Sequence, residues 1–169
     1  QEMYDINLEL VRSLISVLQS TGSKTQVFFS SSSQEEKNNL YGKSKKKGRE
    51  MFSEWAKTSG GKFVGMIIPN VFGPFGNPNY NSFISTFSYK LTHGETPEIM
   101  IDSEVSLIYV GELVNNIIKM IENKESHDLV NISSSSTIKV SEILLRLNQF
   151  KFDYLDNCKI PTLTNKFDI

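Results

Sequence analysis

The residues whose types and spacing could do chemistry lie between Val27 and Lys45. An apolar run, Val27–Phe29, is followed by four serines and later by Tyr41 and Lys45, which are four residues apart. On a helix this spacing places both side chains on one face, one turn from each other. An ammonium beside a phenol stabilises the phenolate, so the phenol gives or takes a proton more easily near neutral pH. A serine hydroxyl from the preceding turn could hydrogen-bond the same reacting oxygen.

The Tyr–Lys pair by itself is a weak signal, because the same spacing occurs by chance on many solvated helix faces. The elements expected before the pair favour a catalytic interpretation. A strand is expected at Gln26–Phe29, a serine turn at Ser30–Ser33, and then a helix over residues 39–58. This order brings a hydroxyl group to the start of the helix that carries the pair.

The elements that must position these residues alternate between helix and strand. We expect helices over 3–20, 39–58, 82–91, 111–123 and 140–150, strands over 26–29, 62–68, 98–100, 105–110 and 128–132, a long loop over 69–81 and a polar loop over 133–136. The alternation predicts an α/β fold, a Rossmann-like parallel sheet with flanking helices. We interpret residues 1–150 as the catalytic and substrate domain and 151–169 as a tail or linker.

Composition excludes several function classes. The chain has 169 residues, 38% hydrophobic and 22% charged, with a net charge of −1, which gives no support to nucleic-acid or anionic-membrane binding. One cysteine and two separated histidines predict neither a disulfide framework nor a metal site. The basic residues between Lys43 and Arg49 are interpreted mainly as a solvated face. No stretch is apolar enough to span a bilayer and no signal peptide is visible, so the cytoplasm is expected.

The strand, serine turn and Tyr–Lys helix together resemble the catalytic segment of the extended short-chain dehydrogenases/reductases, a family of NAD(P)-dependent nucleotide-sugar epimerases, dehydratases and reductases. The positions that match its catalytic residues are Asn7, Ser32, Tyr41 and Lys45. The resemblance implies that Tyr41 protonates the alkoxide formed when hydride reaches a sugar ketone, while Ser32 hydrogen-bonds the carbonyl oxygen. It also implies that Lys45 holds the nicotinamide ribose and that Asn7 helps to orient Lys45 through a water.

The segment Pro69–Pro74, PNVFGP, resembles the family signature after the next strand. The resemblance implies that Pro69 and Val71, with Tyr41 and Lys45, contact the cofactor. Loops at the carboxyl ends of parallel strands form the ligand crevice of such sheets, so the amide-rich loop that follows is expected to contact the nucleotide-sugar. The expected substrate contacts are Ser33, Asn70, Asn79, Tyr80 and Asn81.

One branch of the family matches better than the rest. The run Asn77–Phe87, NPNYNSFISTF, looks like the capsular-polysaccharide enzymes that form UDP-N-acetyl-L-fucosamine, and residues 152–167 resemble the junction to their carboxy-terminal cupin domain. In that branch the cupin epimerises sugar C3 and the reductase domain reduces the C4 ketone with NADPH. The implied function is a UDP-sugar 4-keto reductase that uses NADP or NAD.

The sequence departs from the family in three places. Ile68 stands where an arginine is common, and Gly111–Glu112 stands where an acidic pair is common. The Gly-x-x-Gly-x-x-Gly turn that brings a pyrophosphate to a helix N-terminus is not among these residues, nor is a cupin half. We therefore interpret the chain as a segment of a larger enzyme or a truncated reading frame, and expect it to bind NADP(H) weakly or not at all by itself.

Two alternatives stay open. A UDP-sugar 4-epimerase or 4,6-dehydratase uses the same Ser, Tyr and Lys, although a dehydratase usually adds an acidic pair where Ser33–Gln34 stand here. The alternative from another class is a non-catalytic module that serves assembly or is left by truncation.

The resemblance also implies a homodimer or higher oligomer, because family members pair the helices equivalent to 3–20 and 39–58 across a two-fold axis. We interpret Ile6, Leu10 and Leu14 as a stripe that faces the chain's own sheet. The residues predicted to anchor the interface are Leu8, Val11, Ile15, Phe52 and Trp55.

Overall fold

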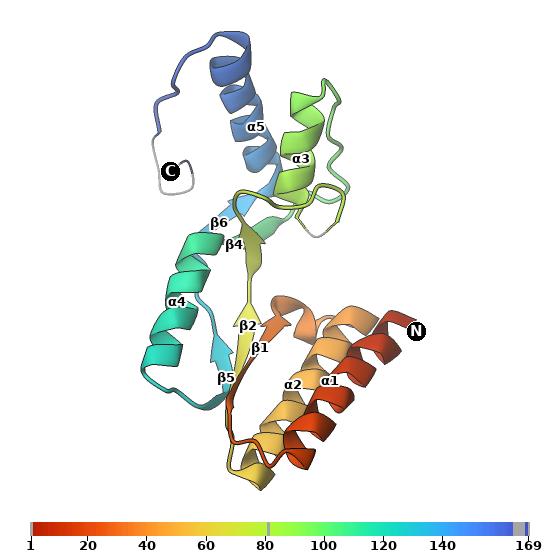
Figure 1. Cartoon of the computed structure of the whole chain (residues 1–169). Coiled ribbons are helices and arrows are strands. Elements are labelled where there is room, and N and C mark those ends of the chain that lie inside the picture. The colour runs from red at the N-terminus through yellow and green to blue at the C-terminus, as the bar shows by residue number, and fades with distance from the viewer. Residues whose placement is uncertain (1, 81, 164–167, 169) are drawn as a thin grey trace. The chain divides into compact units, whose positions relative to one another are not determined.

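The computed structural model describes residues 2–80, 82–163 and 168 and has two compact units. Unit 1 comprises residues 1–69 and 114–133, and unit 2 comprises residues 70–113 and 134–169 (Figure 1). Both units combine helices with a small sheet, which confirms the predicted α/β class. Among the described helices, none has the length and apolar character needed to cross a membrane. The predicted boundary near residue 150 stays a prediction.

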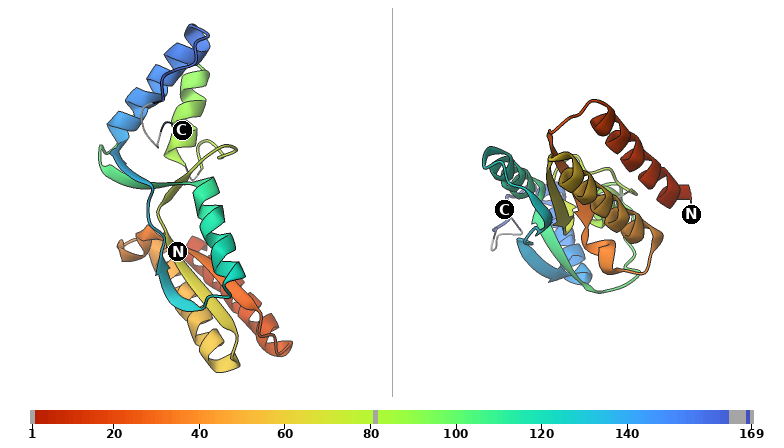
Figure 2. Two further views of the ribbon diagram at one scale, coloured as in Figure 1. Left: turned by 90° about the vertical axis from the view of Figure 1, so that its left-hand side faces the viewer. Right: turned by 90° about the horizontal axis from the view of Figure 1, so that it is seen from below.

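Unit 1 contains the parallel sheet that the sequence predicted. Its elements are α1 (Glu2–Ser20), β1 (Gln26–Ser32), the 3-10 helix η1 (Ser33–Glu36), α2 (Leu40–Ser59), β2 (Lys62–Ile68), residues 114–122 of α4 (Val110–Glu122) and β5 (His127–Asn131). The strand order is β1-β2-β5, and both pairs are parallel. Figure 2 shows α1 and α2 beside each other, with α2 nearer to the sheet.

Both ends of α2 follow from its sequence. The Asn39 side-chain oxygen accepts the Gly42 N–H at 2.7 Å and caps the first turn. Gly60 ends the helix with φ of 73°, a left-handed conformation that glycine adopts without a steric cost. The predicted Tyr–Lys helix is therefore confirmed to within a residue or so at either end.

The serine run differs from its prediction. Instead of breaking the strand, Ser30–Ser32 continue β1 and pair with Met66–Ile68 of β2. Ladder hydrogen bonds come from the backbone, so small polar side chains do not prevent a strand, and Ser31 is buried in the sheet. The expected turn at Ser30–Ser33 is wrong by three residues, because the chain first leaves the strand at Ser33.

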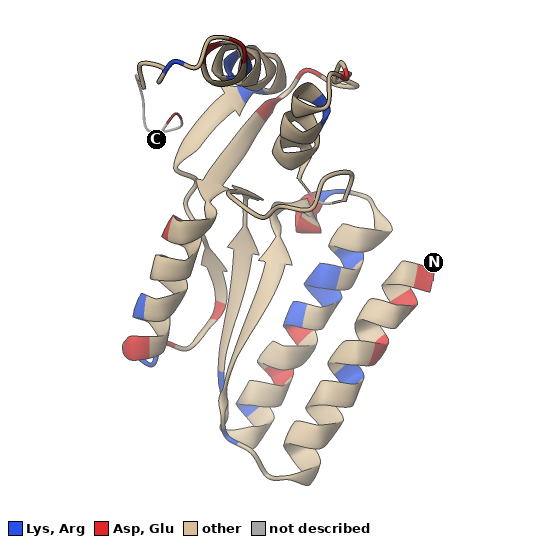
Figure 3. Cartoon of the chain, turned by 45° about the horizontal axis from the view of Figure 1, so that its top comes forward, with Lys and Arg blue, Asp and Glu red and all other residues tan. Residues whose placement is uncertain are grey.

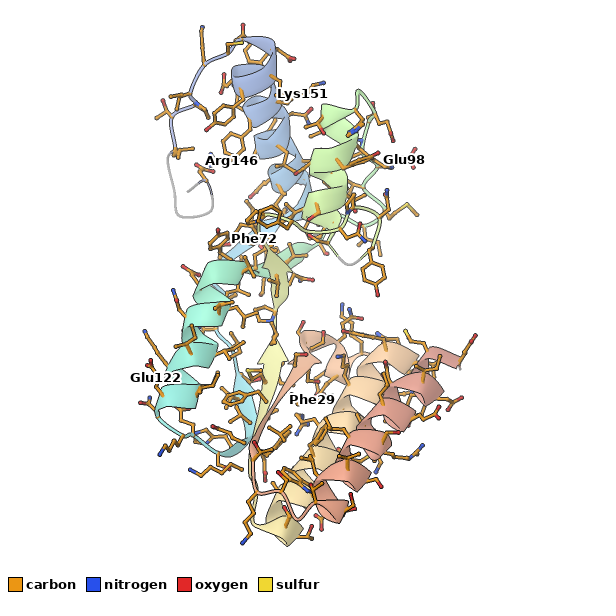
Figure 4. The ribbon with its side chains drawn as sticks, viewed as in Figure 1. Phe29, Phe72, Glu98, Glu122, Arg146 and Lys151 are labelled. Atoms are coloured by element: carbon orange, nitrogen blue, oxygen red, sulfur yellow. The ribbon has the colours of Figure 1, made fainter. Side chains whose placement is uncertain are left out.

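The core of unit 1 lies where α2 packs between α1 and the sheet. A Cβ at Gly48 would approach the Phe29 ring to 3.0 Å and Val11 Cγ2 to 3.2 Å, so glycine lets the three elements come close. Phe52 of α2 stacks against Phe63 of β2 with ring centroids 6.1 Å apart. Figure 4 shows Phe29 between β1 and α2.

The buried and the exposed apolar faces of α1 are interchanged relative to the prediction. Leu8, Val11 and Leu18 are buried, whereas Ile6, Leu10 and Leu14 are 48%, 65% and 48% exposed. The predicted interface anchors Phe52 and Trp55 are also buried in the core of this chain, at 3% and 2% exposure, and Ile15 packs against the same core. Both faces of α1 have helical spacing, so periodicity alone could not tell which one meets α2.

Unit 2 is built from shorter strands. Its elements are β3 (Asn70–Phe72), α3 (Phe83–Thr92), β4 (Glu104–Tyr109), the first turn of α4, β6 (Ser136–Lys139), α5 (Val140–Phe150) and the π-helical η2 (Lys151–Asp156). β3 is parallel and β6 antiparallel to β4, in the order β3-β4-β6. Asp102 caps α5 by accepting the Ser141 N–H at 2.9 Å.

Three predictions in unit 2 are wrong. Residues 98–100 form no strand, β3 lies inside the predicted long loop, and β6 occupies part of the predicted polar loop and beyond. Strands of three or four residues are too short to leave a readable period of two in the sequence.

We predict that Leu8→Ala lowers the free energy of unfolding of this chain by ~2–5 kcal/mol, as expected for a buried leucine. Leu10→Ala, a matched change on the same helix, should change it by less than ~0.5 kcal/mol because Leu10 is exposed. Urea unfolding at low protein concentration would measure both. Equal losses, or a larger loss for Leu10→Ala, would contradict this assignment of the two faces.

Candidate active site

The predicted catalytic serine lies at the end of β1 in unit 1. The Ser32 Oγ accepts the N–H of Gln34 at 3.2 Å and so caps η1. Accepting this bond uses a lone pair of the hydroxyl oxygen and keeps its proton available for donation. Ser33 follows as the exposed first residue of η1. The local backbone therefore prepares Ser32 as a hydrogen-bond donor.

Tyr41 and Lys45 lie in the first turns of α2, beside the end of β1. The Lys45 Nζ donates to the carbonyl oxygen of Ser30 at 3.1 Å. It lies 5.4 Å from the Phe29 ring centroid and 5.7 Å from that of Tyr41. Burial lowers the pKa of Lys45 below its ordinary value. The structure thus brings a partly desolvated ammonium next to a phenol at the carboxyl end of a parallel strand.

Asn7 reaches the same turn of α2 from α1. Its Nδ2 donates to the Ser44 Oγ at 2.9 Å, and the Ser44 hydroxyl donates to the Tyr41 carbonyl oxygen at 2.8 Å. Ser44 is 1% exposed. Asn7 therefore contacts the backbone of the Tyr41 turn through Ser44, a residue that the sequence analysis did not single out. The water-mediated link from Asn7 to Lys45 stays a prediction.

A buried ion pair lies directly behind the serines, and the sequence analysis missed it. Arg49 of α2 binds Glu35 of η1 with two bonds, Nη2–Oε2 at 2.8 Å and Nε–Oε1 at 2.9 Å. The side chains are 13% and 4% exposed, and the Ser31 hydroxyl donates to Glu35 as well. The sequence analysis groups Arg49 with the solvated basic residues of this helix. Lys43, Lys46 and Lys47 among them are exposed, and Figure 3 shows the basic positions along α2 in blue.

The pair is ionised over the ordinary pH range. Burial by itself raises the pKa of Glu35, but hydrogen bonds from Arg49 and Ser31 outweigh it and lower the pKa below its usual value. The hydrogen bonds that Arg49 donates to Glu35 in turn raise the pKa of Arg49. Two charges are therefore held out of water, which is costly unless each is fully hydrogen-bonded.

The remaining predicted residues lie at or beyond the end of unit 1. Pro69 is the last residue of unit 1 before β3 begins in unit 2. Within unit 2, Val71 pairs with Ile108, and the Asn70 amide donates to the Ser106 carbonyl oxygen at 3.3 Å.

The amide-rich loop follows β3 in unit 2. The Asn79 N–H donates to Thr86 at 2.9 Å, and Asn79 has φ of 57°. Tyr80 is 76% exposed. Asn81 lies outside the described residues. The contacts of these residues with ligands stay predictions.

We predict that the stability of this chain depends on pH through Glu35. A carboxylate whose pKa is lowered by folding adds stability above its unfolded pKa, and this stability is lost as the pH falls through the folded value. Glu35→Gln should cost on the order of 3 kcal/mol at pH 7, because Arg49 stays buried without its partner, and should flatten the loss of stability below about pH 4.5.

Urea unfolding between pH 3 and 7 would test this prediction, with Glu36→Gln, a change at the exposed neighbour, as the control. Parallel curves for wild type and Glu35→Gln would contradict it.

Two known proteins match most of this chain. The chain is 29% identical over 147 residues to UDP-2-acetamido-2,6-beta-L-arabino-hexul-4-ose reductase of Pseudomonas aeruginosa. The aligned region covers 86% of this chain and 40% of that protein. The crystal structure of capsular polysaccharide assembling protein CapF from Staphylococcus aureus matches with a TM-score of 0.82 and 30% identity, over 94% of this chain and 44% of that one. The chain thus spans less than half the length of either relative.

A more distant structure shares the fold. UDP-N-acetylglucosamine 4-epimerase from Methanobrevibacter ruminantium, solved with UDP-N-acetylmuramic acid, matches with a TM-score of 0.73 at 22% identity, over 95% of this chain and 56% of that chain. The sequence pattern of the NAD dependent epimerase/dehydratase family matches residues 1–133. The resemblance inferred from the serine turn and the Tyr–Lys helix is confirmed, and the chain belongs to the NAD dependent epimerase/dehydratase family.

Proposed function

We propose that this chain is the catalytic segment of a UDP-sugar 4-keto reductase in the biosynthesis of a capsular or other surface polysaccharide. The observation that carries the proposal is the clustering of Tyr41 and Lys45 at the end of the strand that carries Ser32. The reductase and the capsular polysaccharide protein among its relatives support the finer assignment.

The residues of unit 1 fit the nicotinamide-ribose end of NADP(H) or NAD(H). The Lys45 ammonium has three N–H donors, of which the bond to Ser30 uses one, so the others can reach ribose hydroxyls. Its partial burial strengthens such bonds, because water competes less for them. When bound, the reduced cofactor would supply the hydride that reaches sugar C4.

The protein residues would then handle the oxygen and its proton. Ser32 donates a hydrogen bond to the C4 oxygen and stabilises the negative charge that develops there. Tyr41 gives its phenolic proton to that oxygen, and the positive charge of Lys45 favours the phenolate that remains. Asn7 holds the backbone of Tyr41 through Ser44. A proton from solvent restores the phenol.

The nucleotide-sugar contacts expected from the sequence are part of the proposal. In this proposal Ser33, Asn70, Asn79, Tyr80 and Asn81 bind the nucleotide-sugar, while Pro69 and Val71 lie on the cofactor side. The exposed Tyr80 side chain and the amides of its neighbours can donate and accept hydrogen bonds, as a sugar nucleotide requires.

We also propose that the chain self-associates through the outer face of α1. Its exposed apolar residues repeat every three or four positions along the whole helix; they are Met3, Ile6, Leu10, Leu14 and Val17. A stripe of this kind suits a two-fold contact in which the same face meets itself in a second copy. The proposed contact surface therefore lies on the opposite face of α1 from Leu8, Val11 and Ile15, which the sequence analysis predicted to form the interface.

We predict that Tyr41→Phe in the complete natural protein lowers turnover ~100- to 10,000-fold, because the proton donor is lost, and leaves the fold intact. NADPH oxidation with a UDP-4-keto-sugar would measure turnover, and circular dichroism would check folding. A folded variant within a few-fold of wild type would remove Tyr41 from the mechanism. Interconversion of UDP-sugar epimers without net NADPH oxidation would assign the 4-epimerase instead.

We predict that Leu10→Glu shifts this chain from dimer toward monomer, because a charge would enter the proposed apolar contact. Leu145→Glu, a matched change at a 71% exposed leucine of α5, should leave the dimer intact. Sedimentation velocity at high micromolar concentration would compare the two variants. A monomeric wild type would refute the proposed self-association.

A further inference from the structure

We infer that Glu35 and Arg49 are positioning residues that orient the Ser32 hydroxyl. This inference rests on the proposed function for the role of Ser32, but its structural basis lies entirely within unit 1.

The first observation is that the end of β1 and the η1 turn that follows it contain no apolar side chain. These are the seven residues Ser30–Glu36, SSSSQEE. A cavity of about 220 Å³ borders the turn, with Ser32, Ser33, Glu35 and Arg49 in its lining. Ser30–Ser32 are held by the ladder between β1 and β2, whereas the position of η1 beyond them depends on polar side-chain contacts.

The second observation is a continuous set of contacts from the sheet to Ser32. Arg49 lies along β2, where a Cβ at Gly65 would come within 2.7 Å of the Arg49 side chain. Arg49 binds Glu35 through two bonds that form a rigid fork. Glu35 belongs to the single turn of η1, whose Gln34 N–H donates to the Ser32 Oγ.

The other contacts between η1 and α2 do not fix the orientation of η1 by themselves. The carbonyl oxygen of Gln34 lies against Gly42, where any Cβ would collide with it, and the Asn39 amide donates to the Gln34 side chain at 3.3 Å. Both contacts hold the turn at Gln34 only. Glu35 is the second point of attachment, where Ser31 donates one hydrogen bond and Arg49 donates the two bonds of the fork. Two points fix the rotation of the turn where one does not. Without the fork, Glu35 keeps only the bond from Ser31, and we expect the Gln34 N–H to turn away from Ser32.

The alternative is that the pair only stabilises the fold, and a double-mutant cycle separates the two roles. In the complete natural protein, we expect Glu35→Gln to lower kcat for reduction of a UDP-4-keto-sugar ~10- to 100-fold, with KM changed less than ~3-fold. In a Ser32→Ala background the same substitution should lower kcat less than ~2-fold, because the hydroxyl it positions is already gone.

Two further variants control the cycle. Glu36→Gln, at the exposed neighbour, should leave kcat unchanged. Arg49→Lys keeps the charge but replaces the fork with a single ammonium, so it serves as the milder change if Glu35→Gln does not fold. A folded Glu35→Gln or Arg49→Lys variant with wild-type kcat, or an equal loss of kcat with and without Ser32, would overturn the inference.

Hydrogen exchange of the full chain gives a readout that does not depend on activity. We expect Glu35→Gln to speed exchange of the Gln34 amide at least ~10-fold more than it speeds exchange of the amides in the middle of α2, whose rates report the loss of global stability. An unchanged Gln34 amide would also overturn the inference. If the wild-type enzyme does not reduce UDP-sugars, the proposed function fails, whereas the exchange result still decides whether the pair holds Ser32.

Discussion

The packing of α2 against β1 is the interaction on which the rest of unit 1 depends. Phe29 and Phe52 meet across this contact with ring centroids 5.5 Å apart, and Gly48 lets the helix approach closely. Aromatic contacts of this kind bury a large apolar area, which is the main favourable term in folding. Tyr41 and Lys45 lie on the same helix, one to two turns before Gly48. The packing of α2 against β1 therefore also sets their place beside the end of β1.

Polar contacts hold the first half of α2, whereas its second half combines an apolar core with the hydrogen bond that Ser53 donates to Asp128 at 2.7 Å. Asn39, Asn7, Ser44 and the Glu35–Arg49 pair all lie near the first half of α2, and Trp55 and Ala56 lie in the apolar core near its end. Buried polar groups cost free energy unless they are paired, so they tend to be kept where they serve a site. Their concentration around the serine turn agrees with a catalytic role for this end of the sheet.

Unit 2 is built differently from unit 1. Its strands are short, and the loop between β3 and α3 carries the exposed side chains of Phe75 and Tyr80. Long surface loops on a small sheet are suited to substrate recognition, because they can vary without disturbing the core. A reductase is among the relatives of this chain, and a 4-epimerase shares its fold.

Local chemistry in the sequence determined the helices and the longer strands, and it suggested the candidate catalytic residues. Caps such as Asn39 and Gly60 act within a few residues, and the Tyr41–Lys45 spacing is a property of one helix, so both could be predicted without the fold. Tertiary structure alone decided which face of α1 is buried, because Leu8 and Leu10 are equally apolar and only the position of α2 distinguishes them. It alone also brought Arg49 to Glu35 across fourteen residues, since a charged side chain on a helix carries no local sign that a partner will bury it.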